Sequence, residues 1–210
     1  MYSYYKSLFG SEDGGTYLLV EAPWSTEHML SELDNEELTK PFTMEEIELV
    51  VKEMKTNTAP GPDGLPVIFY KHFWEMVKEM VKRMLDSPHA EELQLRRLNY
   101  GVVTLIPKTK DAATIKQYRP ICLYYVCYKI VTKVLTNRLE RVADKVVSKS
   151  QTAFMKNGNI LDGVVTIHEV FHELRRTKQE GVILKLDFEK AYDRVNWDFL
   201  QEVLLKKGFI

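Results

Sequence analysis

Residues Val182–Trp197 read VILKLDFEKAYDRVNW, and they join an apolar run to a cluster of polar side chains. The run Val182–Leu186 predicts a buried β-strand, and Asp187 follows directly at its end. A carboxylate placed where a strand reaches the surface suits a hard cation such as Mg²⁺, which prefers oxygen ligands. On spacing alone, a metal ligand and a solvated aspartate at a strand end both remain open.

Composition limits the class of protein. The chain has 210 residues, of which 45% are hydrophobic and 28% charged, as in an ordinary globular protein of one large or two small domains. No apolar run approaches the roughly 18–20 residues of a membrane span. The N-terminus lacks the basic start and apolar centre of a signal peptide, and two cysteines are too few for a disulfide framework. We expect an intracellular protein, in either the nucleus or the cytoplasm.

Charge is distributed unevenly along the chain. Residues 1–58 contain twelve acidic and four basic residues, whereas Arg96–Lys145 contains eleven basic and three acidic residues. A basic surface attracts polyanions, because phosphate neutralisation supplies most of the sequence-independent affinity for nucleic acid. The basic part therefore predicts a nucleic-acid-binding surface, and a merely solvated face is the alternative.

The first half of the chain is predicted to be mainly helical. Tyr2–Phe9 favours a short helix, and residues 11–41 favour an acidic linker with at most short helical turns. Thr43 and Glu46 form a capping-box pattern that begins a helix over Met44–Lys55. After a loop rich in proline and glycine at Asn57–Pro66, Val67–Leu85 shows helical spacing of aromatic and methionine side chains, which we assign to the core.

A hairpin and three further helices follow. Tyr100–Pro107 predicts a strand, Lys108–Lys116 a polar tip, and apolar sequence returns after Tyr118. Lys108 and Arg119 could then face each other across the hairpin, where two cations would suit a triphosphate. Helices are predicted over three later segments, which are Val126–Val147, Asn159–Lys178 and Trp197–Lys207 with Asn196 as N-cap. Because strands do not alternate regularly with helices, the fold class is α+β.

One short pattern suggests different chemistry. His168-Glu-Val-Phe-His172 matches H-E-x-x-H, in which two histidines on one helical face bind zinc and the glutamate activates a water. The third ligand would have to come from the 38 residues after His172, where Glu189 and Glu202 are the main candidates. Alternatively, the histidines only border the core. Zinc hydrolysis is thus a remote alternative.

Seven stretches in fixed order carry a resemblance to one enzyme family. They are APGPDGLP (Ala59–Pro66), NYGVVTLIPK (Asn99–Lys108), YRPICL (Tyr118–Leu123), KIVTKVLTNRL (Lys129–Leu139), SQTAF (Ser150–Phe154), NILDG (Asn159–Gly163) and LKLDFEKAYDRVNW (Leu184–Trp197). In order and spacing they resemble the reverse transcriptases of non-LTR (LINE-type) retrotransposons, especially those of plant genomes.

The resemblance implies a partial right-hand polymerase fold. Residues 43–180 would be a fingers-like region of helices and a β-hairpin, residues 181–210 the first palm strand and the following helix, and residues 1–42 an acidic linker or N-terminal extension. The palm sheet would be incomplete within these 210 residues.

The resemblance also implies RNA-directed DNA synthesis on an RNA template with a DNA primer, dNTPs and Mg²⁺. Asp187 matches the first metal-binding aspartate, and the backbone carbonyl of Phe188 would be a second metal ligand. Lys108 and Arg119 match residues that grip the incoming triphosphate. Tyr192 matches a bulky aromatic that rejects a ribose 2′-hydroxyl, and a buried structural tyrosine is the alternative. Phe188 and Tyr192 thus border the same nucleotide site, whereas Asp193 is assigned no metal.

These 210 residues contain no Tyr-x-Asp-Asp motif, which the family carries after the first aspartate. Two Mg²⁺ ions need more than one carboxylate, and the missing parts of the palm and the thumb would also be needed. A non-catalytic nucleic-acid-binding remnant is therefore the alternative function.

We accordingly expect no primer extension by the 210-residue chain alone. The measurement is extension of a DNA primer on an RNA template with dNTPs and Mg²⁺, with an intact reverse transcriptase as the positive control. Robust extension by this chain would refute the expectation.

Overall fold

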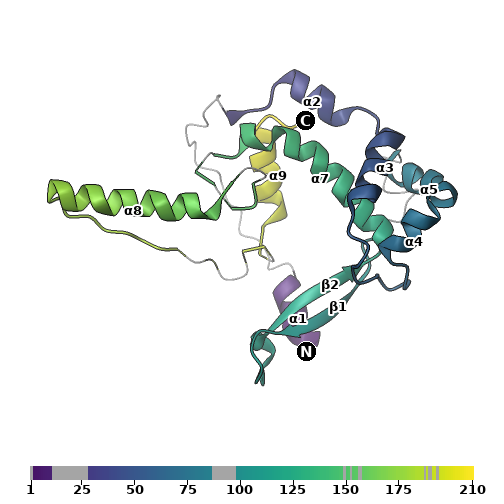
Figure 1. Cartoon of the computed structure of the whole chain (residues 1–210), viewed down its shortest axis with the longest axis horizontal. Coiled ribbons are helices and arrows are strands. Elements are labelled where there is room, and N and C mark those ends of the chain that lie inside the picture. The colour runs from purple at the N-terminus through teal and green to yellow at the C-terminus, as the bar shows by residue number, and fades with distance from the viewer. Residues whose placement is uncertain are drawn as a thin grey trace. The chain divides into compact units, whose positions relative to one another are not determined.

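The computed structural model describes residues 2–10, 28–86, 98–148, 150–151, 153–155, 158–186, 188, 191–192 and 194–210. Helices and one two-stranded antiparallel sheet make up the described part, which confirms a mixed helical and strand structure (Figure 1). The elements are α1 (Tyr2–Phe9), α2 (Glu32–Thr39), α3 (Met44–Glu53), α4 (Val67–His72), α5 (Trp74–Asp86), β1 (Gly101–Pro107), η2 (Ile115–Gln117), β2 (Tyr118–Tyr124), α7 (Val126–Val146), α8 (Ile160–Thr177) and α9 (Trp197–Lys206). None of the helices described here is long and apolar enough to cross a membrane.

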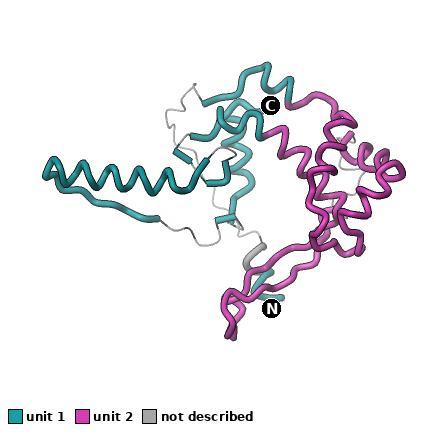
Figure 2. Tube along the Cα trace, viewed as in Figure 1, with its two compact units in different colours: residues 1–37, 140–210 teal, residues 38–139 magenta. Residues whose placement is uncertain are grey.

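The chain divides into two compact units (Figure 2). Unit 2 is residues 38–139, and unit 1 combines residues 1–37 with residues 140–210. The division predicted from the sequence, at residues 42/43 and 180/181, remains a prediction about a larger polymerase fold.

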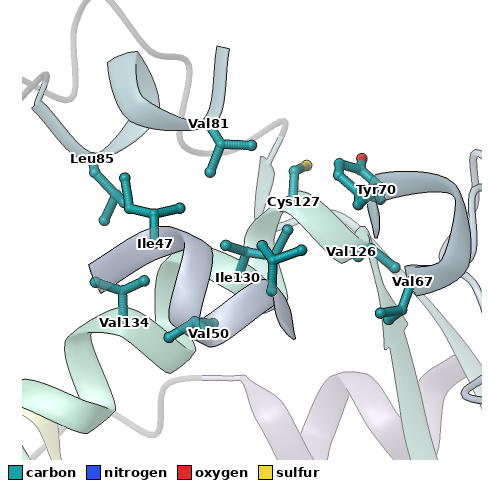
Figure 3. Packing of buried hydrophobic residues seen from close by; sticks show 11 residues of the cluster. Ile47, Val50, Val67, Tyr70, Val81, Leu85, Val126, Cys127, Ile130 and Val134 are labelled. Carbon is teal, nitrogen blue, oxygen red and sulfur yellow. The ribbon is translucent and has the colours of Figure 1, made fainter. Parts of the chain in front are cut away.

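Unit 2 is built around the helix α3, which begins where the sequence predicted. The Thr43 hydroxyl accepts a hydrogen bond from the Glu46 amide, and the Glu46 carboxylate accepts one from the Thr43 amide. Ile47, Val50 and Val51 form its buried face. They pack with buried side chains of α4, α5 and the first turns of α7 (Figure 3). These side chains are Val67, Tyr70, Val81, Leu85, Val126, Cys127, Ile130 and Val134.

The predicted helix over residues 67–85 is two helices in the structure. Phe73 ends α4 with φ −102° and ψ 28°, and α5 begins at the next residue. No proline or glycine marks this position, so the sequence carried no signal for the break. The assignment of all aromatic and methionine side chains here to the core is also wrong, because Met76 is 79% exposed and Met80 is exposed. A flexible methionine side chain can lie on the buried or on the exposed face of a helix, so its spacing alone did not assign it to the core.

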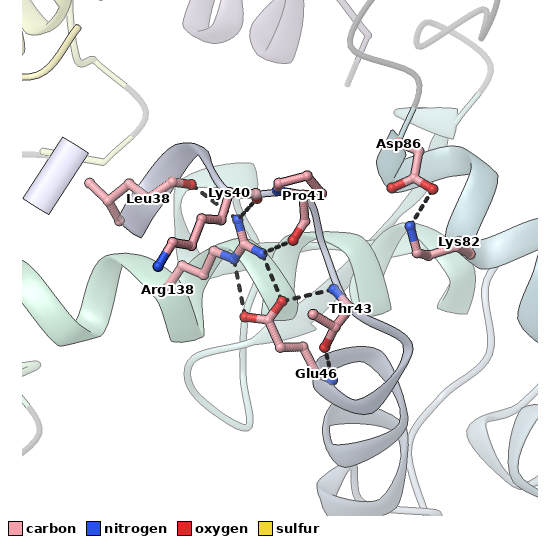
Figure 4. Close-up of polar contacts among 8 residues, drawn as sticks. All are labelled: Leu38, Lys40, Pro41, Thr43, Glu46, Lys82, Asp86 and Arg138. Atoms are coloured by element: carbon pink, nitrogen blue, oxygen red, sulfur yellow. Dashed lines mark hydrogen bonds and ion pairs between the residues drawn. The ribbon is translucent and has the colours of Figure 1, made fainter. Parts of the chain in front are cut away.

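One buried guanidinium holds the two ends of unit 2 together (Figure 4). Arg138 of α7 is only 5% exposed, and its Nε and Nη2 atoms donate to the Glu46 carboxylate at 3.1 and 2.7 Å. Its remaining donors bind the backbone carbonyls of three residues that precede α3, which are Leu38, Lys40 and Pro41. The guanidinium carbon lies 3.8 Å from the centre of the Phe42 ring. Its donors are therefore used inside the fold.

In unit 1, the segment from Leu30 to Asn35 contacts the end of the chain. The Leu30 amide donates to the Lys207 carbonyl at 2.9 Å, and the Asn35 side-chain amide donates to the Gly208 carbonyl at 2.7 Å. Gly208 follows the end of α9 with φ +85°, a left-handed conformation that favours glycine. Asn196 caps the start of α9 through the Phe199 amide at 2.9 Å, as predicted.

The sequence predicted at most short helical turns in residues 11–41, but the structure contains the helix α2 there. Ser31 and Asp34 form a reciprocal cap: the Ser31 hydroxyl accepts from the Asp34 amide, and the Asp34 carboxylate accepts from the Ser31 amide and hydroxyl. The carboxylate also binds Lys145 of α7 at 2.6 Å. This pairing across 111 positions of sequence stabilises a helix whose own apolar face is small.

The predicted strand Val182–Leu186 is not part of a sheet in the described structure. Its apolar side chains are exposed, and α8, which precedes it, has no buried residue. Backbone donors and acceptors of a strand need a neighbouring strand, and none of the described residues supplies one. The structure thus corrects the prediction of a strand for these residues, whereas their assignment to a polymerase palm remains a prediction.

We expect Arg138→Ala to lower the free energy of unfolding by about 3–5 kcal/mol, because it leaves Glu46 and three carbonyls without their partner. Urea unfolding followed by circular dichroism measures the change. Lys133→Ala is the matched control, since Lys133 is an exposed cation of the same helix, and we expect its effect to stay within about 0.5 kcal/mol. Equal effects of the two substitutions would contradict a clamp at Arg138.

The cap at Asp34 predicts a pH dependence. The hydrogen bond from Lys145 and those from Ser31 lower the pKa of Asp34 from 3.8 to about 2. A lowered folded-state pKa adds stability above the unfolded pKa and loses it as pH falls toward the folded pKa. The stability difference between the wild type and Asp34→Asn should therefore stay constant from pH 7 to about 4 and shrink between pH 4 and 2. A difference that is unchanged at pH 2, measured by urea unfolding, would disprove this linkage.

Candidate nucleotide-binding site

The β1–β2 hairpin places the two predicted triphosphate-binding cations on one face. Ile106 pairs with Arg119, and Pro107 with Tyr118. The Lys108 amide continues the ladder by donating to the Gln117 carbonyl at 2.8 Å. Directly opposed residues share a face and every second residue returns to it, so Lys108 and Arg119 are diagonal neighbours on one face, with Cα atoms about 7–8 Å apart.

The hairpin tip is ordered by its own polar contacts. The side-chain oxygen of Gln117 accepts from the amides of Ala113 and Thr114, and the Tyr118 hydroxyl donates to the Ala112 carbonyl. Lys108 Nζ donates to the Lys116 carbonyl at 3.0 Å. Arg119 and Lys108 are exposed, and within the described structure neither forms an ion pair with a carboxylate. Both charges therefore face solvent.

The predicted palm residues belong to unit 1. Asp187 lies outside the described residues, as do Glu189 and Asp193. Phe188 is 74% exposed and Tyr192 is 93% exposed, so the alternative of a buried structural tyrosine is wrong. Lys108 and Arg119 belong to unit 2, and the structure therefore describes the two halves of the predicted site separately.

A metal site is not formed by the part of the chain that the structure describes. No three His, Cys, Asp or Glu side chains there come together as ligands. His168 and His172 are exposed on α8 and do not border a core, while Glu202 lies on α9. The zinc alternative has no support from these residues, and the assignment of Mg²⁺ to Asp187 and the Phe188 carbonyl remains a prediction.

The basic segment Arg96–Lys145 is not one continuous binding surface. Arg138 is buried, Lys129 Nζ donates to the Ala59 carbonyl at 3.1 Å, and Lys145 binds Asp34. Three of the predicted cations thus stabilise the fold, and Arg96 and Arg97 lie outside the described residues. The exposed basic residues of the hairpin are Lys108, Lys110, Lys116 and Arg119.

A groove and two uncharged side chains of unit 2 have no function that the sequence predicted. A groove of about 340 Å³ lies between α3 and α7, with the lining residues Val50, Glu53, Met54, Lys129, Thr132, Lys133 and Thr136. Burial raises the pKa of the Cys127 thiol, so this cysteine remains a neutral core group at physiological pH. Contact with the Cys122 thiol raises the pKa of Tyr124 to about 12, which keeps that phenol neutral too.

Comparison with known proteins identifies the class of domain. Residues 106–209 match the family model "Reverse transcriptase (RNA-dependent DNA polymerase)". The chain is 34% identical to the Transposon TX1 uncharacterized 149 kDa protein of Xenopus laevis, over 99% of this chain and 16% of that protein.

Two similar proteins come from insect retrotransposable elements. One is the retrovirus-related Pol polyprotein from type-1 element R2 of Nasonia vitripennis, which is 25% identical over 95% of this chain and 19% of that protein. The other is the corresponding polyprotein from element R1 of Bradysia coprophila, 25% identical over 76% of this chain and 16% of that protein. The chain spans less than one fifth of the length of each of these three relatives. It therefore carries part of a reverse transcriptase domain of the non-LTR retrotransposon family.

Proposed function

We propose that this chain supplies the nucleotide-gripping part of an RNA-directed DNA polymerase. The observation that carries the proposal is the hairpin register, which puts Lys108 and Arg119 on one exposed face. The Lys108 ammonium acts as a point charge, whereas the planar Arg119 guanidinium can bind two phosphate oxygens at once. Together they suit the triphosphate of an incoming dNTP.

The remaining roles follow from the family. Reverse transcriptases generally use divalent metal ions and act on an RNA template and a DNA primer. Asp187 and the Phe188 carbonyl would hold Mg²⁺, which stabilises the charge that develops on the leaving pyrophosphate. The exposed Tyr192 ring is free to lie against the sugar of a bound nucleotide, where its bulk would exclude a 2′-hydroxyl. A plant-type element is the source we propose for the chain.

A second candidate function is nucleic-acid binding without catalysis. The four exposed hairpin cations favour it, because they can neutralise phosphates of any sequence. The two functions differ in a measurable way. A triphosphate site depends on Lys108 and Arg119 in particular, whereas general phosphate neutralisation depends only on the number of cations.

Binding of dTTP to the 210-residue chain by calorimetry tests the proposal. We expect Lys108→Ala and Arg119→Ala each to weaken dTTP binding by about 10- to 100-fold. The reason is that each removes one charge-assisted hydrogen bond, which contributes about 1.5–3 kcal/mol. Lys110→Ala is the matched control, because it removes the same charge at the tip, beyond the ladder, and its effect should be less than about threefold. Equal losses in all three variants would instead favour the second candidate.

Binding to an RNA–DNA hybrid at several salt concentrations completes this test. Under the second candidate, each of these substitutions removes about one phosphate contact, and the salt dependence of hybrid binding becomes weaker by the corresponding amount. Under the proposed function, hybrid binding changes little while dTTP binding falls. Failure of the wild type to bind dTTP at all would overturn the proposed function.

A further inference from the structure

The hairpin that carries Lys108 and Arg119 joins the core of unit 2 at its base, where β2 leads into α7. Most residues of β1 are exposed, and Val102, Val103 and Ile106 are among them. At the base, β2 passes through Tyr125 into α7, whose Val126 and Ile130 are completely buried. The Tyr125 ring also contacts the Tyr100 ring, which precedes β1, at 6.4 Å between centroids. The direction of the hairpin is therefore set where β2 meets α7.

The loop Ala59–Pro66 presses its backbone against this junction. A Cβ atom on Gly61 would lie 2.6 Å from the Tyr124 carbonyl oxygen and 2.7 Å from the Tyr125 Cα atom. Both neighbours are backbone atoms, which cannot rotate away as a side chain can. Any larger residue at Gly61 must displace either the loop or the junction.

The loop itself has a defined conformation. The Gly64 amide donates to the Gly61 carbonyl at 3.0 Å, which closes a turn around Pro62 and Asp63. The Asp63 carboxylate accepts from the Leu65 amide at 3.1 Å. Lys129, one turn into α7, donates from Nζ to the Ala59 carbonyl. The loop is thus tied to α7 through Lys129, and its glycine contacts the junction that leads into this helix.

We propose that Gly61 is a positioning residue for nucleotide binding, because its close approach to Tyr124 and Tyr125 sets the angle at which the hairpin carries Lys108 and Arg119. The inference rests on the proposed function of these two cations. Seven residues of strand span about 24 Å, so a tilt of about 10° at the base moves the tip by about 4 Å. Such a movement would separate Lys108 and Arg119 from a bound triphosphate, and each charge-assisted hydrogen bond lost costs about 10- to 100-fold in affinity.

The test uses Gly61→Ala in the 210-residue chain, with Gly64→Ala as the matched control. Gly64 has φ +72° and open space around its Cβ position, so alanine there strains the same turn without touching the junction. Two readouts are needed. The first is dTTP affinity, and the second is the distance between spin labels on p-acetylphenylalanine at positions 76 and 110, which are exposed sites in unit 2.

We expect Gly61→Ala to shift the label distance by about 4 Å and to weaken dTTP binding by about 10- to 100-fold, whereas Gly64→Ala changes neither. An unchanged distance in folded Gly61→Ala would overturn the inference. If the wild type binds no dTTP, the proposed function fails, and the distance shift still decides whether Gly61 sets the direction of the hairpin. Should Gly61→Ala not fold, Lys129→Met removes only the Ala59 contact: a broadened distance distribution supports the inference, and an unchanged one overturns it.

Discussion

The fold of unit 2 depends on one shared carboxylate. Glu46 Oε2 accepts from the Thr43 amide and from Arg138, so the same side chain starts α3 and binds α7. A partly buried carboxylate is costly unless its charge is paired, and a buried guanidinium has the same requirement. Each therefore needs the other in place. Because Arg138 also binds carbonyls of residues 38–41, this one pair fixes two helices and the entry of the chain.

The basic residues of the chain fall into two groups, those that stabilise the fold and those that remain exposed for binding a ligand. Arg138, Lys129 and Lys145 bind carboxylates or carbonyls inside their own units. The hairpin is different, because most of β1 is exposed and the hairpin cations have no acidic partner among the described residues. A charge left unpaired on a projecting, ordered element is what a phosphate ligand requires.

Local signals in the sequence predicted the helix ends well. The capping box at Thr43 and the cap at Asn196 were correct, because each depends on residues three positions apart. Interactions across long separations were not predictable. The Arg138–Glu46 pair spans 92 positions, and nothing near Arg138 distinguishes it from the exposed cations of α7. The prediction of a strand at Val182–Leu186 was wrong for the same reason, because a strand depends on partners elsewhere in the chain.

The candidate site was predictable to the extent that it is local. Lys108 and Arg119 were placed together because an antiparallel hairpin links sequence distance directly to spatial distance. The loop Asn57–Pro66 was recognisable from its prolines and glycines, but the sequence could not say which part of the molecule its backbone contacts. In the structure, the partner of Gly61 is the chain's own junction between β2 and α7. Under the proposed positioning role, Gly61 would act on a nucleotide about 24 Å away through the direction of the strand that it supports.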